Sequence, residues 1–259
     1  MDLNLTGKTA VVTGASRGIG LATVRTLIEE GANVVGASRS ITPELRETGA
    51  IVVAADLSTA EGVDSLIATA LSEQGGIDLL VNNVGGGDEA VMGYLDSDDK
   101  QWHRMFEINV MSTVRATRAA LPSLIERRGA VVNVSSTVAR MPFGVPASYS
   151  AVKAAVSALS KALAEEFGLH GVRVNTVSPG LVRTSVYEDP NGPVAQMAAA
   201  AGVPLADFVT QIARSQSITT GRMSEPEEIA ALIAFLLSAR AENVTGADYV
   251  IDGGTIKTV

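Results

Sequence analysis

The chain has 259 residues, no cysteine, two histidines and a formal net charge of −8 at pH 7. The lack of cysteine excludes disulfides and thiolate metal ligands, and two histidines are too few for a typical zinc site. The negative net charge argues against a surface that binds nucleic acid or an anionic membrane. With 46% hydrophobic and 19% charged residues, the chain has ample material for one large α/β domain or two small ones. The first residues lack the basic segment and apolar run of a signal peptide, and no apolar run approaches the about 20 residues that span a bilayer. We therefore expect a cytoplasmic protein without a bound metal.

Residues 8–13 form a short, β-branched apolar run, which predicts a buried strand. The run leads into the glycine-rich turn 14–20 and then into a helical pattern that reaches Ile28 and stops at Gly31. A strand, a glycine-rich turn and a helix form the first half of a dinucleotide site, because free N–H groups at the helix start bind a pyrophosphate and glycine lets the backbone approach it. An ordinary tight turn is the alternative, which the presence of three glycines disfavours. The cofactor contacts expected here are Gly14, Ser16, Arg17, Gly18, Ile19 and Gly20.

A second strand is predicted over 34–37 and ends at Ser38 and Arg39. At this strand end an acidic residue would hold the 2′-hydroxyl of an NAD ribose, whereas an arginine suits the 2′-phosphate of NADP. A guanidinium pairs well with a phosphate dianion, and Arg17 supplies another one in the glycine-rich turn. We therefore favour NADP(H) over NAD(H), with a solvated Arg39 as the alternative.

A third predicted strand, over 50–54, is followed by Asp56 and Leu57, and a fourth, over 77–81, is followed by the polar segment 82–85. Ligands of open parallel sheets bind at the carboxyl ends of the strands, so we place both groups at the cofactor. The Asp56 carboxylate would accept a hydrogen bond from the adenine amino group, or it would cap the helix that follows; both possibilities stay open. The cofactor contacts expected from the second group are Asn83, Val84 and Gly85.

A long helical pattern over 98–128 carries Asn109 near its middle, where asparagine is mildly unfavourable. The Asn109 side chain therefore either bonds to a backbone group or serves a catalytic site. A fifth strand is predicted over 130–134, and Ser136 follows its carboxyl end.

Tyr149 and Lys153 are four residues apart in the next helical pattern, so they lie one turn apart on the same face. A phenol holds its proton up to a pH of about 10, but a nearby ammonium favours the phenolate and lowers that pKa. A tyrosine tuned in this way gives a proton to a carbonyl oxygen or takes one from an alcohol. The alternative is a core aromatic, because Tyr149 also continues an apolar stripe through Val152 and Val156.

The remaining elements are a strand over 172–177, a helix over 226–238 and a strand over 248–251. The irregular stretch 182–223 indicates a substrate loop or lid with one or two helices. Seven strands that alternate with helices predict a doubly wound, parallel α/β sheet of the Rossmann type with helices on both faces, in a single domain spanning 1–259.

Taken in order, these motifs resemble the short-chain dehydrogenase/reductase family, and its 3-oxoacyl-reductase-like branch, from about residue 5 to residue 254. Each motif is weak by itself, but all of them in this order are very specific. One departure is Val84, where the family usually has alanine. The matching motifs are Thr13-Gly14-x-x-x-Gly18-x-Gly20, Asp56, Asn82-Asn83-x-Gly85, Asn109, Ser136, Tyr149-x-x-x-Lys153 and Pro179-Gly180-x-x-x-Thr184.

The resemblance implies an oxidoreductase that transfers a hydride between NAD(P)H and a carbonyl or secondary alcohol. Tyr149 would donate or accept the proton, and Lys153 would lower the pKa of Tyr149 and bind the nicotinamide ribose. Ser136 would bond the substrate oxygen, and Asn109 would hold a water in a proton relay. The family pairs through its two long helices and its C-terminal strand, which implies a homotetramer. The nicotinamide contacts that the resemblance implies are Pro179, Gly180, Val182 and Thr184.

The segments expected to line the substrate pocket, 86–95, 137–146 and 181–208, are largely apolar, so we expect an apolar carbonyl substrate. The chain is also similar to 3-oxoacyl-carrier-protein reductases, which hold their acidic carrier with two arginines. Arg127 matches the first arginine but His170 stands at the second, and the negative net charge further weakens this hypothesis. The rival hypotheses are an NAD-dependent alcohol dehydrogenase of the same family and a non-catalytic NADP-binding regulator, against which the complete catalytic set argues.

Overall fold

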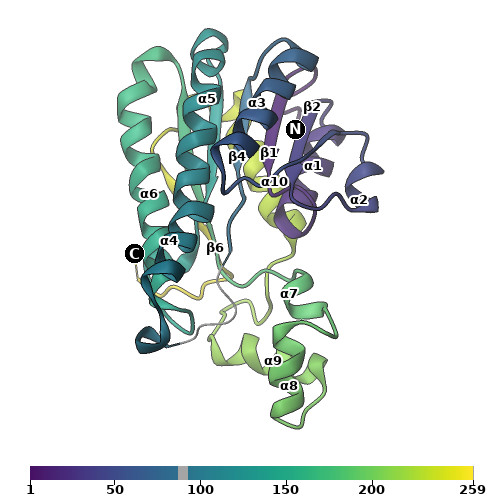
Figure 1. Ribbon diagram of the computed structural model, residues 1–259, viewed down its shortest axis with the longest axis vertical. Helices are drawn as coiled ribbons and strands as arrows, with labels where there is room; N and C mark the ends of the chain where they lie inside the picture. Colours follow the sequence, from purple (N-terminus) through teal and green to yellow (C-terminus); the bar gives the residue numbers. More distant parts are fainter. Residues whose placement is uncertain (87–92, 259) are drawn as a thin grey trace.

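Seven parallel strands form the sheet at the centre of the computed structural model, which describes residues 1–86 and 93–258 (Figure 1). The strand order is β3-β2-β1-β4-β5-β6-β7, so the chain moves outward from β1 to β3 and then returns to place β4 on the other side of β1. Every pair of neighbouring strands is parallel. The predicted doubly wound sheet of one Rossmann-like domain is therefore confirmed. The strands are β1 (Thr9–Thr13), β2 (Asn33–Ser38), β3 (Ile51–Ala54), β4 (Leu79–Asn82), β5 (Ala130–Val134), β6 (Arg173–Pro179) and β7 (Asp248–Ile251).

Helices follow the strands and cover both faces of the sheet. Three of them, α7 to α9, lie together at one end of the molecule, below the sheet in Figure 1. Within the described part of the chain, no helix has both the length and the apolar character needed to cross a membrane. The helices are α1 (Gly18–Glu29), α2 (Pro43–Arg46), α3 (Ala60–Gln74), α4 (Asp99–Phe106), α5 (Ser112–Arg127), α6 (Ala147–Phe167), α7 (Ser185–Glu188), α8 (Pro193–Ala200), α9 (Leu205–Ser215) and α10 (Pro226–Leu237).

Local sequence signals explain where the helices begin and end. Helix α3 begins where the Thr59 hydroxyl accepts a hydrogen bond from the Gly62 N–H at 3.1 Å, and it ends at Gly75, whose φ of 69° lies in the left-handed region that glycine tolerates. Helix α10 begins with a capping box between Glu225 and Glu228 and has a proline at its first position.

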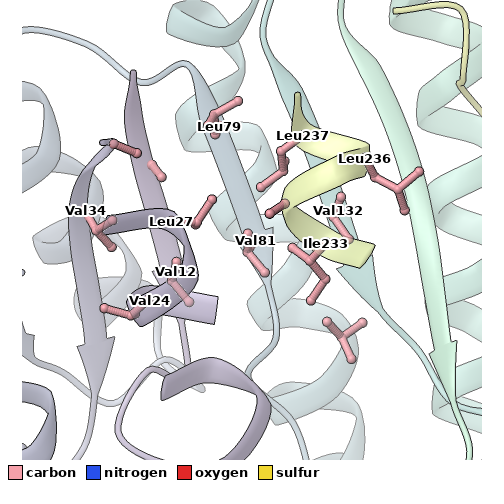
Figure 2. Packing of buried hydrophobic residues seen from close by; sticks show 14 of the residues in the cluster. Val12, Val24, Leu27, Val34, Leu79, Val81, Val132, Ile233, Leu236 and Leu237 are labelled. Atoms are coloured by element: carbon pink, nitrogen blue, oxygen red, sulfur yellow. The ribbon is translucent and has the colours of Figure 1, made fainter. Parts of the chain in front are cut away.

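The sheet separates two hydrophobic layers. Successive strand residues point to opposite faces, so Val12 and Val81 pack in the layer under α1 and α10, whereas Val11 and Leu80 pack in the layer under α3 and α5. The strands are buried on both faces, which is why they appear in the sequence as continuous apolar runs. Figure 2 labels ten residues of the first layer: Val12, Val24, Leu27, Val34, Leu79, Val81, Val132, Ile233, Leu236 and Leu237.

Two expectations from the sequence are corrected. The helical pattern over 98–128 is divided into α4, a π-helical turn η2 (Glu107–Met111) and α5. The turn opens at Asn109, whose side-chain amide donates to the Met105 carbonyl at 2.9 Å and so competes with the regular helical bonding. The stretch 182–223 contains three helices, α7, α8 and α9, instead of one or two.

Candidate active site

The glycine-rich turn between β1 and α1 is packed too closely for side chains. A Cβ on Gly20 would lie 2.1 Å from the Gly14 carbonyl oxygen, and a Cβ on Gly18 would lie 3.0 Å from the Thr184 side chain. Gly14 and Gly18 also adopt φ values of 67° and 53°, which residues with side chains rarely do. Arg17 is the N-cap residue of α1, but its side chain makes no capping hydrogen bond and the first turn has no acidic residue. The N–H groups at the start of α1 are therefore available to an anion. The glycine-rich turn and the start of α1 form a cradle so narrow that one added methyl group would fill it, and this fits a dinucleotide pyrophosphate.

This cradle lies beside the point where the strand order reverses, between β1 and β4. The Thr13 hydroxyl accepts hydrogen bonds from the N–H groups of Asn83 and Val84 at 2.9 and 3.0 Å. The Asn83 side chain donates to the carbonyl oxygens of Thr13 and Gly14 at 3.0 and 3.1 Å. The segment after β4 is thus held against the glycine-rich turn, at the position where open parallel sheets bind their ligands.

Tyr149 and Lys153 lie one turn apart on α6 and both are directed inward. The Tyr149 ring packs in a cluster with Met105, and the Ser136 side chain is near enough to the Tyr149 hydroxyl to lower the pKa of Tyr149 in part. Lys153 is only 4% exposed; its Nζ donates to the Val134 carbonyl at 3.1 Å and lies 5.7 Å from the centre of the Tyr149 ring. Tyr149 therefore packs as the core aromatic of the alternative and also lies beside Lys153, and its catalytic role stays a prediction.

Two further serines link the end of β5 to α6 by hydrogen bonds. The Ser135 hydroxyl donates to the Lys153 carbonyl oxygen at 2.9 Å, and the Ser157 hydroxyl donates to Ser135 at 2.8 Å. These bonds fix the position of α6 relative to Ser136, which follows Ser135 in the chain. The distance between the Ser136 and Tyr149 side chains is consequently set by buried hydrogen bonds.

Asn109, in the π-helical turn, is buried and holds the loop after β4. Its amide donates to the carbonyl oxygens of Met105 and Gly86 at 2.9 and 3.0 Å, and its Oδ1 accepts the Gly86 N–H at 3.1 Å. Its own carbonyl oxygen accepts the Thr113 hydroxyl at 3.1 Å. The structure thus gives Asn109 the backbone-bonding role, beside Lys153, and a catalytic role stays a prediction.

The residues after β6 lie across the cradle from β4. Gly180 is packed so that a Cβ would lie 2.7 Å from the Asp252 Cβ, and its N–H donates to Ile251 at 3.0 Å. Val182 is buried and pairs with Ser224 in an isolated bridge. Together with Thr184, which touches the glycine-rich turn, these residues form the side of the cleft that we assigned to the nicotinamide.

The residues assigned to the adenosine end gather after β2 and β3. Asp56 accepts hydrogen bonds from the N–H and hydroxyl of Ser58 at 3.0 and 2.8 Å, and these bonds lower the pKa of Asp56, with a smaller electrostatic contribution from Arg39. Thr59 caps α3, so the alternative in which Asp56 caps that helix is wrong. Ser38 uses its hydroxyl to bond the Ser40 carbonyl at 2.7 Å.

Comparison with known proteins decides the family. A family model described as enoyl-(acyl carrier protein) reductase matches residues 14–255. The 3-oxoacyl-[acyl-carrier-protein] reductase of Vibrio cholerae is 34% identical over 97% of this chain and 98% of its own length. The chain belongs to the short-chain dehydrogenase/reductase family. Glucose 1-dehydrogenase 2 of Bacillus subtilis is also 34% identical, over 98% of this chain and 96% of its own. The crystal structure of L-sorbose reductase from Gluconobacter frateurii, complexed with NADPH and L-sorbose, matches with a TM-score of 0.93, 34% identity and full coverage of both chains.

As a member of this family, the protein is an NAD(P)-dependent oxidoreductase that acts on CH–OH or C=O groups. The electrostatics of its tyrosine nevertheless differ from our expectation. Burial raises the pKa of Tyr149 to about 12, and the Ser136 hydrogen bond lowers it only in part. Lys153 is itself buried, and its pKa falls to about 8. Burial therefore disfavours both the Tyr149 phenolate and the Lys153 ammonium. For Tyr149 this effect is larger than the stabilisation of its phenolate by Lys153.

Two features of this short-chain dehydrogenase/reductase were missed in the sequence. The pair Ser135 and Ser157 links α6 to the end of β5, but serines after strands and within helices are too common to signal this. Tyr187, on α7, is close enough for its charge to raise the pKa of Tyr149. Its position three residues after Thr184 is the signal that was available. Residues 87–92 of the expected pocket-lining segment 86–95, including Met92, lie outside the described residues.

Proposed function

We propose that the protein is an NADP-dependent carbonyl reductase with a catalytic set of Ser136, Tyr149, Lys153 and Asn109. The observation that supports this most is the buried Lys153 ammonium, which lies 5.7 Å from the centre of the Tyr149 ring and donates at 3.1 Å to the carbonyl oxygen of Val134, two residues before Ser136. The Ser136 side chain is near enough to the Tyr149 hydroxyl to lower the pKa of Tyr149, and in this proposal both hydroxyls bond the substrate carbonyl oxygen.

The proton chemistry follows from the environment of the phenol. With a pKa of about 12, Tyr149 is protonated at neutral pH and is therefore ready to act as an acid, which favours reduction over oxidation. NADPH supplies the hydride when it is bound. Ser136 holds the substrate oxygen, and Tyr149 donates its proton to that oxygen as it gains electrons. Lys153, protonated below its pKa of about 8, then stabilises the phenolate that remains.

The assignment of NADP rests on Arg39 and Arg17. Both side chains are exposed at the adenosine side of the cradle, and no acidic residue follows β2, where one would hold an NAD ribose. Arg39 also acts on the Asp56 carboxylate, so it lies near the site assigned to adenine. The NADPH in the L-sorbose reductase structure is consistent with this choice.

The substrate has to be argued from this chain, because the relatives are named for a protein-bound acyl group and for sugars. Phe143, Val186 and Met197, from two of the segments expected to line the pocket, are 60%, 45% and 51% exposed. Such exposed apolar side chains favour a substrate with an apolar body. A carrier protein is disfavoured, because Arg127 is engaged with the Asp78 carboxylate at 3.4 Å and the Gly75 carbonyl at 2.9 Å.

A turnover screen tests this proposal. Purified protein is assayed with NADPH and with NADH against a panel of ketones, aldehydes and hydroxyketones. We expect NADPH-dependent reduction, and a loss of about a hundredfold to ten-thousandfold in kcat for Tyr149→Phe, with the Kd for NADPH unchanged. The matched control is Tyr249→Phe on β7. Undiminished turnover by Tyr149→Phe contradicts the mechanism, and NADPH binding without any turnover favours the regulator hypothesis.

We further propose a homotetramer. The outer face of α6 exposes a row of small residues, Ala151, Ala154 and Ala158, and Phe106 on α4 is 43% exposed. Small residues let a second helix approach closely, so α4 and α6 offer a face for another copy. Light scattering is expected to give four times the chain mass of 26.7 kDa, and Ala154→Arg is expected to reduce it. A monomeric mass for the unaltered chain contradicts the proposal.

A further inference from the structure

Arg115, on α5, has a position that the proposed mechanism does not explain. Its Nη1 donates to the Ser58 carbonyl oxygen at 2.8 Å and to Oε2 of Glu107 at 2.7 Å. The Arg115 side chain is only 18% exposed, although its guanidinium is charged. A charge that is largely buried is costly unless it is paired and hydrogen bonded, so these two bonds hold the guanidinium in one place.

Ser58 connects this guanidinium to the residue that we assigned to adenine. The Ser58 N–H and hydroxyl both donate to the Asp56 carboxylate, at 3.0 and 2.8 Å, while the Ser58 carbonyl oxygen accepts the bond from Arg115. Leu57, between the two, is buried in the hydrophobic layer under α3 and α5. The orientation of the Asp56 carboxylate therefore depends on Ser58, and Arg115 holds Ser58 from a helix 57 residues later in the chain.

The turn 56–59 is held by residues at two helices that lie side by side in Figure 1 and pack against each other, α3 and α5. At the start of α3, the N–H and hydroxyl of Thr59 donate to the Asp56 carbonyl oxygen at 3.2 and 2.8 Å. These bonds fix the backbone at Asp56. The bond from α5 fixes the next polar residue, Ser58, whose two donors hold the Asp56 carboxylate.

Glu107 holds the guanidinium in place for this contact. It is the first residue of η2, the π-helical turn that carries Asn109, and it lies eight residues before Arg115. The Glu107 side chain is 44% exposed, so it can be replaced without disturbing the core. Because Ser58 and Glu107 accept from the same Nη1, a weaker bond to Glu107 would let the guanidinium turn away from Ser58.

We propose that Arg115 is a positioning residue for the adenosine half of the cofactor site: through Ser58, it holds the Asp56 carboxylate in the orientation that accepts the adenine amino group. This inference rests on the proposed cofactor site, in which Asp56 contacts adenine. It applies to NADP and NAD alike, because both contain adenine. A carboxylate that is already oriented loses little conformational freedom when the nucleotide binds, so the loss of Arg115 weakens only ligands that contain adenine.

The test compares NADPH with reduced nicotinamide mononucleotide (NMNH), which contains the nicotinamide and its ribose but no adenosine. Fluorescence titration below the Tm gives both Kd values for the unaltered protein, for Arg115→Met and for the matched control Arg118→Met, which replaces an exposed arginine on the same helix. We expect Arg115→Met to raise the Kd for NADPH about tenfold and to keep the Kd for NMNH within about twofold. Arg118→Met is expected to change neither value, which separates the contact with Ser58 from the loss of one positive charge.

A second variant covers the case in which Arg115→Met does not fold. Glu107→Gln removes the partially exposed charge that holds the guanidinium and keeps the size of the side chain. We expect it to raise the Kd for NADPH about threefold to fivefold, with the Kd for NMNH within about twofold. In the background of Asp56→Ala, Arg115→Met and Glu107→Gln are each expected to add less than about twofold, because Arg115 acts through Asp56.

Three results overturn the inference. One is an equal loss for NADPH and NMNH, which would mean a general loosening of the fold. Another is an unchanged Kd for NADPH in Arg115→Met, whatever its Tm, and the third is a loss that persists in full in the Asp56→Ala background. Binding and turnover with NADPH by the unaltered protein sustain the proposed function in each of these cases, whereas an unaltered protein that binds neither nucleotide overturns both.

Discussion

The Lys153 ammonium lies next to the α-carbon of Gly85, where an added Cβ would be 3.0 Å from Nζ. The same Cβ would be 2.7 Å from Oδ1 of Asn109. Real Cβ atoms keep a greater distance from both kinds of atom, so glycine is what allows two polar site residues to pack at the end of β4. The glycine in the Asn82-Asn83-x-Gly85 motif thus has a steric reason within the site.

Gly85→Ala is expected to lower kcat about a hundredfold or more. The methyl group forces Lys153 or Asn109 to move, and a displacement of about 1 Å at reacting groups costs a factor of this size. The matched control is Gly86→Ala, because a Cβ at Gly86 would meet nothing within 4 Å. Steady-state kinetics of both variants check the prediction. Equal effects at the two positions would show that loop flexibility, and not the contact with Lys153, matters.

Replacement of Arg39 tests the cofactor preference. Arg39→Ala removes one charge-assisted bond to a 2′-phosphate, which NADH lacks, so we expect the Kd for NADPH to rise about tenfold to a hundredfold with little change for NADH. Arg25→Ala, an exposed arginine on α1, controls for the loss of one positive charge. Fluorescence titration with both nucleotides measures the two constants. Equal affinities in the unaltered protein would refute the NADP assignment.

The sequence predicted the strands well because each is an apolar, β-branched run bounded by glycine or polar residues. Strands β5 and β7 have the predicted bounds, 130–134 and 248–251, and the other five differ by at most two residues at either end. The Tyr149 and Lys153 spacing was equally informative, since four residues on a helix fix a shared face. Such features are local, and the local sequence carries them.

The features that were missed depend on contacts between distant segments. The Asn109 side chain, in the π-helical turn, bonds the nearby Met105 carbonyl oxygen and also Gly86, which lies 23 residues earlier in the chain. The high pKa of Tyr149 follows from the burial of α6 against neighbouring elements, which spacing along one helix does not report.

The buried Lys153 is expected to reduce the stability of the fold at neutral pH. Burial lowers its pKa from 10.5 to about 8, so between these values the unfolded chain binds more protons and the free energy of unfolding rises with pH. Below a pH of about 8 the lysine is charged in both the folded and the unfolded chain, so the whole free-energy cost of burying the ammonium lowers the stability of the fold. Lys153→Met removes this cost but also leaves the Val134 carbonyl without its partner.

We therefore expect Lys153→Met to be more stable at pH 7 by on the order of 2 kcal/mol, or ~4–8 °C in Tm, while it loses reductase activity. The gain is expected to fall to a small remainder at a pH near 10.5, where the lysine is neutral in the folded chain and already half neutral in the unfolded chain. Thermal unfolding of both proteins at the two pH values measures this difference. A gain that is the same at both would assign the effect to packing instead of charge.

Arg173, at the start of β6, caps the C-terminal end of α10 with hydrogen bonds. Its guanidinium donates to the carbonyl oxygens of Leu236 and Leu237 at 2.7 and 3.1 Å, and to Ser238 and Val244 at 3.2 and 3.4 Å. The last carbonyl groups of a helix have no intrahelical partner, and these are partly shielded from water. One side chain therefore satisfies several of them, through a planar arrangement of donors that lysine lacks.

Arg173→Lys is expected to lower the free energy of unfolding by about 2 kcal/mol, or ~4–8 °C in Tm, because the charge is kept but several buried carbonyl groups lose their donor. The kcat of the folded variant is expected to be unchanged, since Arg173 begins β6 while the cofactor cleft lies at the other end of that strand, after Pro179. Arg25→Lys, on the exposed side of α1, should leave Tm where it is, and its comparison with Arg173→Lys separates the carbonyl contacts from the general effect of the exchange. A Tm for Arg173→Lys equal to that of the unaltered protein would mean that water or lysine replaces the hydrogen bonds of the guanidinium without loss of stability. A reduced kcat would mean that a change at the end of α10 alters the geometry of the active site.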